Sequence, residues 1–124
     1  MNGTVAEVMS TNVLTVVETT PLSQVARELR ARNVGSAVVV DSEQKPLGMI
    51  SERELVDSVA AGRNPDQGTA QLWMRNEFVM TEHTTSKAEA VELMRKHNVR
   101  HLPISENGRL VGVISVRDLV ITQG

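Results

Sequence analysis

The stretch GMISERELV, Gly48 to Val56, decides the fold, because GVISVRDLV, Gly112 to Val120, nearly repeats it 64 positions later. Gly, Ile, Ser, Arg, Leu and Val recur in place, and one acid replaces another at the seventh position. Upstream, Asn33-Val34 matches Asn98-Val99 at an offset of 65, so one residue is lost in a polar stretch where a turn is expected. Agreement across two separate blocks indicates an internal duplication, which has to be recognised before any element is assigned.

Both copies predict the element order β-α-β-β-α. In the first copy we expect an extended piece at 13–16, a helix, strands at 37–40 and 47–50, and a last helix from Ser51. Thr20 should be the N-cap of the first of these helices and Pro21 its first helical residue. In the second copy we expect an extended piece at 78–80, a helix behind Thr85, strands at 102–104 and 110–114, and a helix from Ser115. Asn33 and Asn98 suit the left-handed position that ends a helix, and Asn107-Gly108 predicts a hairpin.

The size of each copy bears on the fold class. A copy of about 60 residues buries its own apolar faces poorly, so two copies packed together would share one core. We therefore predict an α/β (α+β) fold in which two β-α-β-β-α repeats pack with pseudo-two-fold symmetry as one module. The predicted division is 1–60 for repeat one, 61–70 for a linker rich in Gly, Pro and polar residues, and 71–124 for repeat two.

Composition excludes several classes of function. The chain has one Trp, one Phe and no Tyr, which argues against single-strand nucleic-acid binding on aromatic platforms. Its net charge of −2 gives no general attraction to polyanions, and the lack of cysteine excludes disulfides and thiolate metal sites. No apolar stretch reaches membrane-spanning length and the N-terminus is unlike a signal peptide, so we expect a soluble, cytoplasmic protein with no membrane partner.

The duplicated blocks, the element order and the segment VRHLPI, Val99 to Ile104, resemble a pair of cystathionine-β-synthase (CBS) domains. The resemblance covers about Val5 to Val120. It implies a stand-alone tandem CBS module whose clefts between the repeats bind AMP, ADP, ATP or S-adenosyl compounds such as S-adenosylmethionine. It also implies a homodimer formed through helices, and a regulatory role toward an enzyme, channel or transporter.

Carried over residue by residue, the resemblance implies a ligand site in the repeat-two cleft. Its candidate residues are Asp118, Ser115, Val113, Ile114, Arg100, Val13, Leu14 and Arg117. A carboxylate such as Asp118 can accept hydrogen bonds from both hydroxyls of a ribose. The planar guanidinium of Arg100 can donate two parallel hydrogen bonds to a phosphate. Arg117 could also reach a phosphate, or it could be a solvated arginine. Val113 would line the base.

The repeat-one cleft departs from this pattern, and we expect it to bind more weakly or to bind another ligand. Glu54 replaces the aspartate, and Gly35 stands where repeat two has Arg100. Its candidate residues are Ser51, Glu54, Met49, Phe78, Val79 and His101.

Simpler interpretations remain beside these. Ser51-x-x-Glu54 and Ser115-x-x-Asp118 are also helix capping boxes, and a cap leaves carboxylate lone pairs for a ligand. His97 and His101 are four residues apart, but Asn98 should end the helix between them, so we assign no metal site.

No nucleophile elbow, Walker loop or thiol is present, so we assign no catalytic residue. The alternative function is a ligand-free dimerisation or protein-interaction module.

Overall fold

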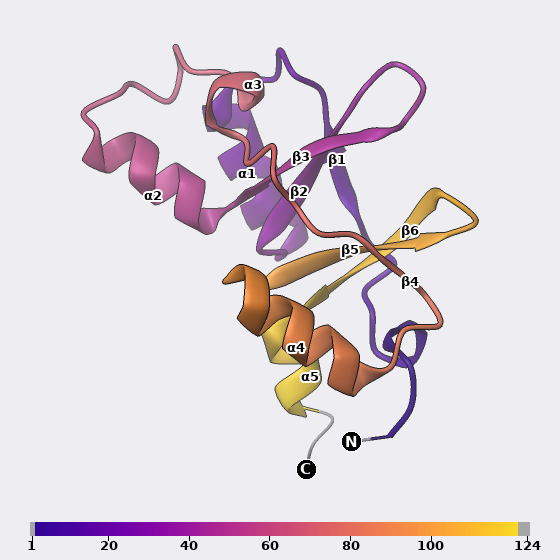
Figure 1. The fold of residues 1–124 in the computed structure, drawn as a ribbon. Helices are drawn as coiled ribbons and strands as arrows, with labels where there is room; N and C mark the ends of the chain where they lie inside the picture. Colours follow the sequence, from indigo (N-terminus) through magenta and orange to yellow (C-terminus); the bar gives the residue numbers. More distant parts are fainter. Residues whose placement is uncertain (1, 122–124) are drawn as a thin grey trace. The chain divides into compact units, whose positions relative to one another are not determined.

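The computed structural model describes residues 2–121, which form two compact units, each with a three-stranded sheet and helices (Figure 1). The mixed α/β prediction is therefore confirmed. Unit 2 is continuous, from Leu14 to Phe78, whereas unit 1 joins the residues up to Val13 with those from Val79 onward. The two units thus do not coincide with the two sequence copies, because the first residues of each copy pack on the sheet of the other copy.

Unit 2 follows the predicted order. Its elements are β1 (Leu14–Val16), α1 (Leu22–Arg32), β2 (Ser36–Val40), β3 (Pro46–Ser51), α2 (Glu52–Ala60) and the short α3 (Ala70–Trp73). The sheet order is β1-β2-β3, with β1 parallel to β2 and β2 antiparallel to β3.

Unit 1 repeats this order behind a 3-10 turn. Its elements are η1 (Val5–Glu7), β4 (Thr81–Glu82), α4 (Lys87–His97), β5 (His101–Glu106), β6 (Arg109–Ser115) and α5 (Val116–Ile121). The sheet order is β4-β5-β6, with the same parallel and antiparallel pairs. The first strand of the second copy begins just after the extended piece expected at 78–80, because the residues that pair with β5 in parallel are Thr81 and Glu82.

Local turn chemistry explains where most elements end. Asn33 and Asn98 close α1 and α4 in the left-handed conformation, at φ 55° and 52°, as predicted. Asn107 and Gly108 both have positive φ, 53° and 81°, which suits the tight turn between β5 and β6. The predicted N-cap at Thr20 is wrong: Pro21 takes that position, and the Thr20 hydroxyl accepts a hydrogen bond from the Val17 N–H at 3.2 Å.

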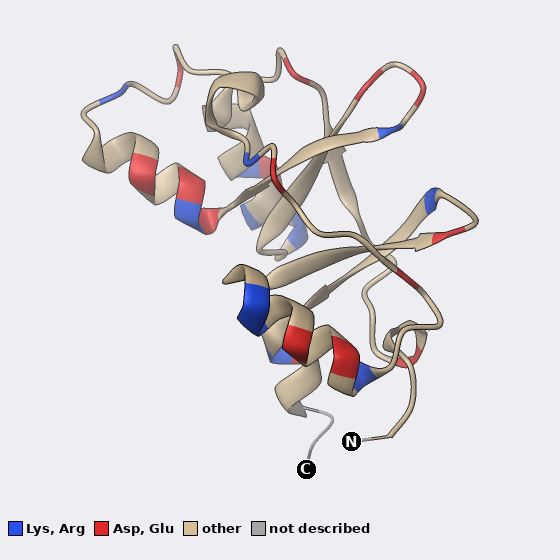
Figure 2. Cartoon of the chain, in the orientation of Figure 1, with Lys and Arg blue, Asp and Glu red and all other residues tan. Residues whose placement is uncertain are grey.

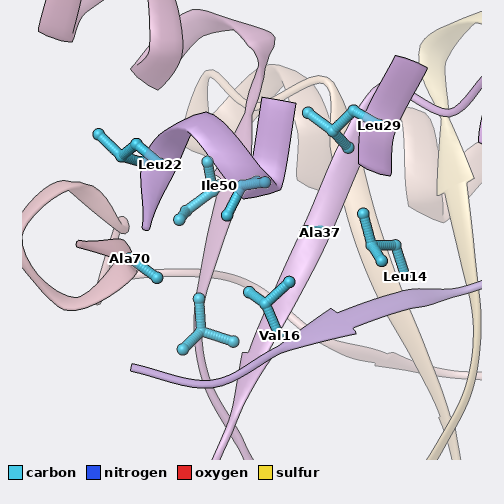
Figure 3. Packing of buried hydrophobic residues seen from close by; sticks show 9 residues of the cluster. Leu14, Val16, Leu22, Leu29, Ala37, Ile50 and Ala70 are labelled. Carbon is cyan, nitrogen blue, oxygen red and sulfur yellow. The ribbon is translucent and has the colours of Figure 1, made fainter. Parts of the chain in front are cut away.

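Each unit has an apolar core of its own. In unit 2, side chains from β1, α1, β2, β3 and α3 converge, as Figure 3 shows for Leu14, Val16, Leu22, Leu29, Ala37, Ile50 and Ala70. In unit 1 the corresponding cluster consists of Val5, Ala90, Met94, Leu102, Ile104, Ile114 and Leu119. No helix within residues 2–121 is both long and apolar enough to cross a membrane.

Two stretches, residues 2–10 and 67–75, begin the two copies, and we call them the lead segments. The first lead segment completes unit 1: the Lys87 N–H donates to the Gly3 carbonyl at 3.1 Å, and Val5 is fully buried. The second completes unit 2 in the same way: the Leu22 N–H donates to the Gly68 carbonyl at 3.0 Å, and Ala70 is fully buried. Each lead segment therefore accepts a hydrogen bond from one of the first backbone N–H groups of a helix, which have no partner within the helix.

The lead segments are also part of the duplication. Gly3-Thr4 and Gly68-Thr69 are identical pairs at an offset of 65, each followed by an apolar residue. The stretch assigned to the linker, 61–70, therefore ends in residues that pack on α1. Its Pro65 carbonyl also accepts a hydrogen bond from Ser23, at 3.2 Å.

Candidate functional site

The candidate acid of repeat two lies where β6 meets α5. The Ser115 backbone N–H and hydroxyl both donate to Asp118 Oδ2, at 2.8 and 3.1 Å, and the Asp118 N–H donates back to the Ser115 hydroxyl at 3.2 Å. This is the reciprocal capping box expected from the sequence. Within the described part of the chain, Asp118 Oδ1 accepts no hydrogen bond. The half-buried carboxylate is thus held in one orientation through Oδ2.

Two basic residues lie close to this box. The Arg100 carbonyl accepts a hydrogen bond from the Val116 N–H at 3.0 Å, which holds the Arg100 backbone against the first turn of α5. Arg117 lies on that same turn, and both arginine side chains are exposed. Unit 1 therefore gathers Arg100, Ser115, Arg117 and Asp118 at one end of its sheet.

Strand alternation separates the two apolar candidates on β6. Ile114 is fully buried in the core of unit 1, so its side chain points away from Val113, which is partly exposed on the opposite face. Val113 forms an isolated antiparallel bridge with Ser10 of the first lead segment, with backbone hydrogen bonds of 2.9 and 3.0 Å. Residues directly opposite in such a pair share a face, so the Ser10 side chain lies beside Val113.

Ser10 lies beside the candidate residue Val113 but was not among the residues predicted from the sequence. Met9 and Met74 match at the repeat offset of 65, which makes Ser10 the counterpart of Arg75. That relation was readable from the sequence, but the pairing of Ser10 with a strand about 100 residues later was not. The candidates Val13 and Leu14, from the first extended piece, fall in different units: Val13 belongs to unit 1, and Leu14 is 2% exposed in the core of unit 2.

The candidate acid of repeat one has the same cap in a different environment. The Ser51 N–H and hydroxyl donate to Glu54 Oε1 at 2.7 and 2.9 Å, and Glu54 is only 5% exposed. Met49 is 7% exposed and exchanges two backbone hydrogen bonds with Arg75, at 2.9 and 3.1 Å. The Gly35 carbonyl takes the place of the Arg100 carbonyl, accepting from the Glu52 N–H at 3.2 Å. These contacts repeat the backbone plan of unit 1 with other side chains.

The remaining repeat-one candidates are divided between the units. Phe78 ends unit 2, whereas Val79 and His101 belong to unit 1. His101 opens β5 and pairs directly with Ser115 in the β5–β6 ladder. Its position is therefore beside the repeat-two box, and the equivalent position in unit 2 is Ser36, which pairs with Ser51.

Close packing explains why both repeated blocks begin with glycine. A Cβ on Gly48 would lie 2.8 Å from the Arg75 carbonyl oxygen and 2.8 Å from Met74 Sδ. A Cβ on Gly112 would lie 2.6 Å from Met9 Sδ and 3.0 Å from the Ser10 carbonyl oxygen. The duplicated glycines thus leave room for the lead segments.

Charge is distributed in both signs over the described residues. Figure 2 shows acidic and basic residues following one another along α2 and α4 and at the tips of the β2–β3 and β5–β6 hairpins. Any attraction of an anionic ligand therefore depends on individual residues such as Arg100 and Arg117, and not on a broad basic surface.

Comparison with known proteins then identifies the family. The family model described as CBS domain matches this chain twice, over residues 5–61 and 70–122. The chain belongs to the CBS domain family. The two CBS matches include both lead segments from Val5 and Ala70 onward, and both capping boxes.

Several relatives share most of this CBS pair. An uncharacterized protein of Methanopyrus kandleri, MK0525, is 35% identical over 94% of this chain, which spans 60% of that protein. The CBS domain-containing protein YhcV of Bacillus subtilis is 32% identical over 98% of this chain and 86% of YhcV.

Solved structures of CBS proteins have the same fold. The CBS-domain containing protein ATU1752 of Agrobacterium tumefaciens is 33% identical, with a TM-score of 0.86 over 93% of this chain and 87% of that one. The CBS domain pair of protein MJ0100, solved in complex with 5′-methylthioadenosine and S-adenosyl-L-methionine, has a TM-score of 0.91 over 100% of this chain and 98% of that one. At 18% identity, that second likeness concerns the fold alone.

Proposed function

We propose that this CBS pair is a non-catalytic regulatory module that binds an adenosine-type ligand through residues of its second repeat. The observation that carries the proposal is the Asp118 carboxylate, which Ser115 holds through Oδ2 while Oδ1 stays unoccupied among the described residues. The MJ0100 CBS pair, which has the same fold, was solved with two adenosine-type compounds. That shared ligand chemistry supports a nucleoside as the ligand of this chain.

The side chains around Asp118 suit the parts of a nucleoside derivative. A carboxylate with a free oxygen is a strong acceptor for the two hydroxyls of a ribose. The partly exposed Val113 offers an apolar contact for the base, as small-molecule sites generally require. Arg100 and Arg117 would bind a negatively charged group attached to the ribose, either a phosphate or the carboxylate of a methionine moiety.

Binding can be tested by titration calorimetry with AMP, ADP, ATP, S-adenosylmethionine and 5′-methylthioadenosine. We expect at least one of the five to bind, and Asp118→Asn to weaken it by about tenfold or more, because a hydrogen bond to a charged group contributes roughly 1.5–3 kcal/mol. Asp57→Asn is the matched control, since Asp57 is an exposed aspartate on α2. The lack of binding by all five compounds, or equal losses in the two variants, would refute the proposal.

The charged end of the ligand is a separate part of the same test. Arg100→Ala should weaken a phosphate-bearing compound more than 5′-methylthioadenosine, which carries no phosphate. A uniform loss across the compounds would show that Arg100 acts on the fold and not on the ligand. The regulated target, an enzyme, channel or transporter, follows only from the family resemblance and belongs to the same proposal.

A second candidate function is self-association as an interaction module. It is favoured by apolar side chains on the last helix of each repeat: Val56 and Val59 on α2 are 65% and 64% exposed, and Val120 on α5 is 60% exposed. Single exposed apolar residues are common, but two that are three residues apart share a helix face. Light scattering should show a homodimer that Val56→Glu weakens, and a monomer in the wild type would exclude this function.

A further inference from the structure

We propose that Met9 and Met74 are reversible oxidation sites, at which a peroxide loosens the two lead segments from their sheets. The chain has no cysteine, so its methionines carry all of its sulfur. Oxidation of methionine to the sulfoxide can be reversed by a reductase. Any reversible oxidation of a sulfur atom in this chain therefore occurs at methionine.

The methionines of the described residues differ in how far solvent reaches them. Met49 and Met94 are 7% and 5% exposed, whereas Met80 is 37% exposed and belongs to neither apolar cluster. Met9 and Met74 combine both situations, because each is partly exposed and also packs against the apolar core of its unit. A small oxidant can thus reach these two sulfur atoms, and a change in their polarity acts on the core packing.

Both sulfur atoms lie against the duplicated glycines, and we call Met9 and Met74 the seated methionines. A Cβ on Gly112 would lie 2.6 Å from Met9 Sδ, and a Cβ on Gly48 would lie 2.8 Å from Met74 Sδ. The space between each sulfur and its glycine is therefore too small even for a methyl carbon. An oxygen atom added to the sulfur has no room on that side.

Backbone pairs next to the seated methionines tie the lead segments to the same strands. Ser10 and Val113 exchange backbone hydrogen bonds of 2.9 and 3.0 Å. Arg75 and Met49 exchange hydrogen bonds of 2.9 and 3.1 Å. In each unit the paired residues directly follow the seated methionine and its glycine in the chain, so a displacement of the methionine is transmitted to these hydrogen bonds.

The oxidation changes both the polarity and the size of the side chain. The lone pair of the thioether sulfur attacks one oxygen of hydrogen peroxide, and the O–O bond breaks. The proton on the transferred oxygen passes to the departing hydroxide, which leaves as water, so the sulfur is oxidised and the peroxide is reduced. A sulfoxide that stays in place brings a polar group against apolar side chains, and one that rotates into water leaves the core. Both arrangements weaken the contact between lead segment and sheet.

Peptide mass spectrometry of the full chain after brief treatment with hydrogen peroxide tests whether the sites react. We expect sulfoxide at Met9 and Met74, as at the exposed Met80. The two buried methionines should remain unmodified in the folded protein. Seated methionines that stay unmodified at a dose that oxidises Met80 would overturn the proposal.

Backbone hydrogen exchange of the oxidised chain tests whether the lead segments loosen. The amide hydrogens of Ser10 and Val113 should exchange about tenfold faster or more, because a polar sulfoxide at the core favours local opening of the lead segment. The amide hydrogens of Arg75 and Met49 should respond in the same way. Treatment with methionine sulfoxide reductases should restore slow exchange, and exchange that stays fast after complete reduction would contradict a reversible site.

Two variants separate the seated methionines from the rest of the chain. The double variant Met9→Leu, Met74→Leu keeps apolar side chains of similar volume that peroxide does not oxidise, so its exchange should not change on treatment. Met80→Leu is the matched control and should respond as the wild type does. Sulfoxides at both sites without faster exchange, or an equal response of the double variant, would refute the loosening. The wild-type measurement needs no variant that folds and involves no ligand, so its failure leaves the proposed function in place.

Discussion

Replacing Gly48 by alanine tests whether the second lead segment must approach β3 more closely than a residue with a Cβ allows. The added Cβ would lie 2.8 Å from the Arg75 carbonyl oxygen and 2.8 Å from Met74 Sδ, distances that real Cβ atoms essentially never show. The sulfur can move by rotation of its side chain. The carbonyl cannot move alone, because Arg75 and Met49 exchange two backbone hydrogen bonds at 2.9 and 3.1 Å.

The magnitude follows from these contacts. Accommodating the methyl group requires the backbone at Arg75 to shift by a few tenths of an ångström, which weakens the two hydrogen bonds that hold it. Overpacking of this kind costs about 1–3 kcal/mol in free energy of unfolding. With a urea m-value of roughly 1–3 kcal/mol/M, the denaturation midpoint should fall by an amount on the order of 1 M.

Urea denaturation followed by tryptophan fluorescence measures this loss, because Trp73 is the only tryptophan and packs against the core of unit 2. Gly112→Ala is the matched control. The atom nearest to the added Cβ is the side-chain sulfur of Met9, and the Ser10 carbonyl oxygen is farther away at 3.0 Å, so we expect a smaller loss in free energy of unfolding. Circular dichroism detects this loss, since unit 1 has no tryptophan. A loss below ~0.5 kcal/mol in Gly48→Ala, the range of neutral surface changes, would refute the close-approach argument.

Two further predictions concern buried side chains. Val5→Ala should lower the free energy of unfolding by about 2 kcal/mol, because Val5 is fully buried in the core of unit 1 and each buried methylene contributes about 0.8 kcal/mol before the cavity is counted. A neutral result in urea denaturation would mean that the first lead segment does not stabilise unit 1. Ser58→Ala should leave stability unchanged or raise it by about 1 kcal/mol, because the fully buried Ser58 hydroxyl has no hydrogen-bond partner among the described residues. A marked drop in thermal midpoint would show that this hydroxyl is bonded in solution.

The local structure of each repeat was predictable because its signals lie within a few residues of one another. Asn33 and Asn98 tolerate a left-handed backbone, and both end a helix as expected. The capping boxes that begin at Ser51 and Ser115 formed as read, since a hydroxyl and an acid three residues apart meet in the first turn of a helix. The N-cap expected at Thr20 was one residue too early, because Pro21 is still extended and the Thr20 hydroxyl accepts from the Val17 N–H instead of from the helix.

The sequence alone determined the duplication, the mixed α/β class, the order of elements and the pairing of Ser115 with Asp118, all of which depend on periodicity, turn chemistry and short spacings. Only the tertiary structure decided that residues 2–10 join unit 1, that Ser10 lies opposite Val113, and that Glu54 is 5% exposed whereas Asp118 is half-buried. The physical reason is that burial and long-range pairing depend on which surfaces the folded chain brings together. Two nearly identical segments therefore acquire different environments, and the chemistry available at each acid depends on that environment.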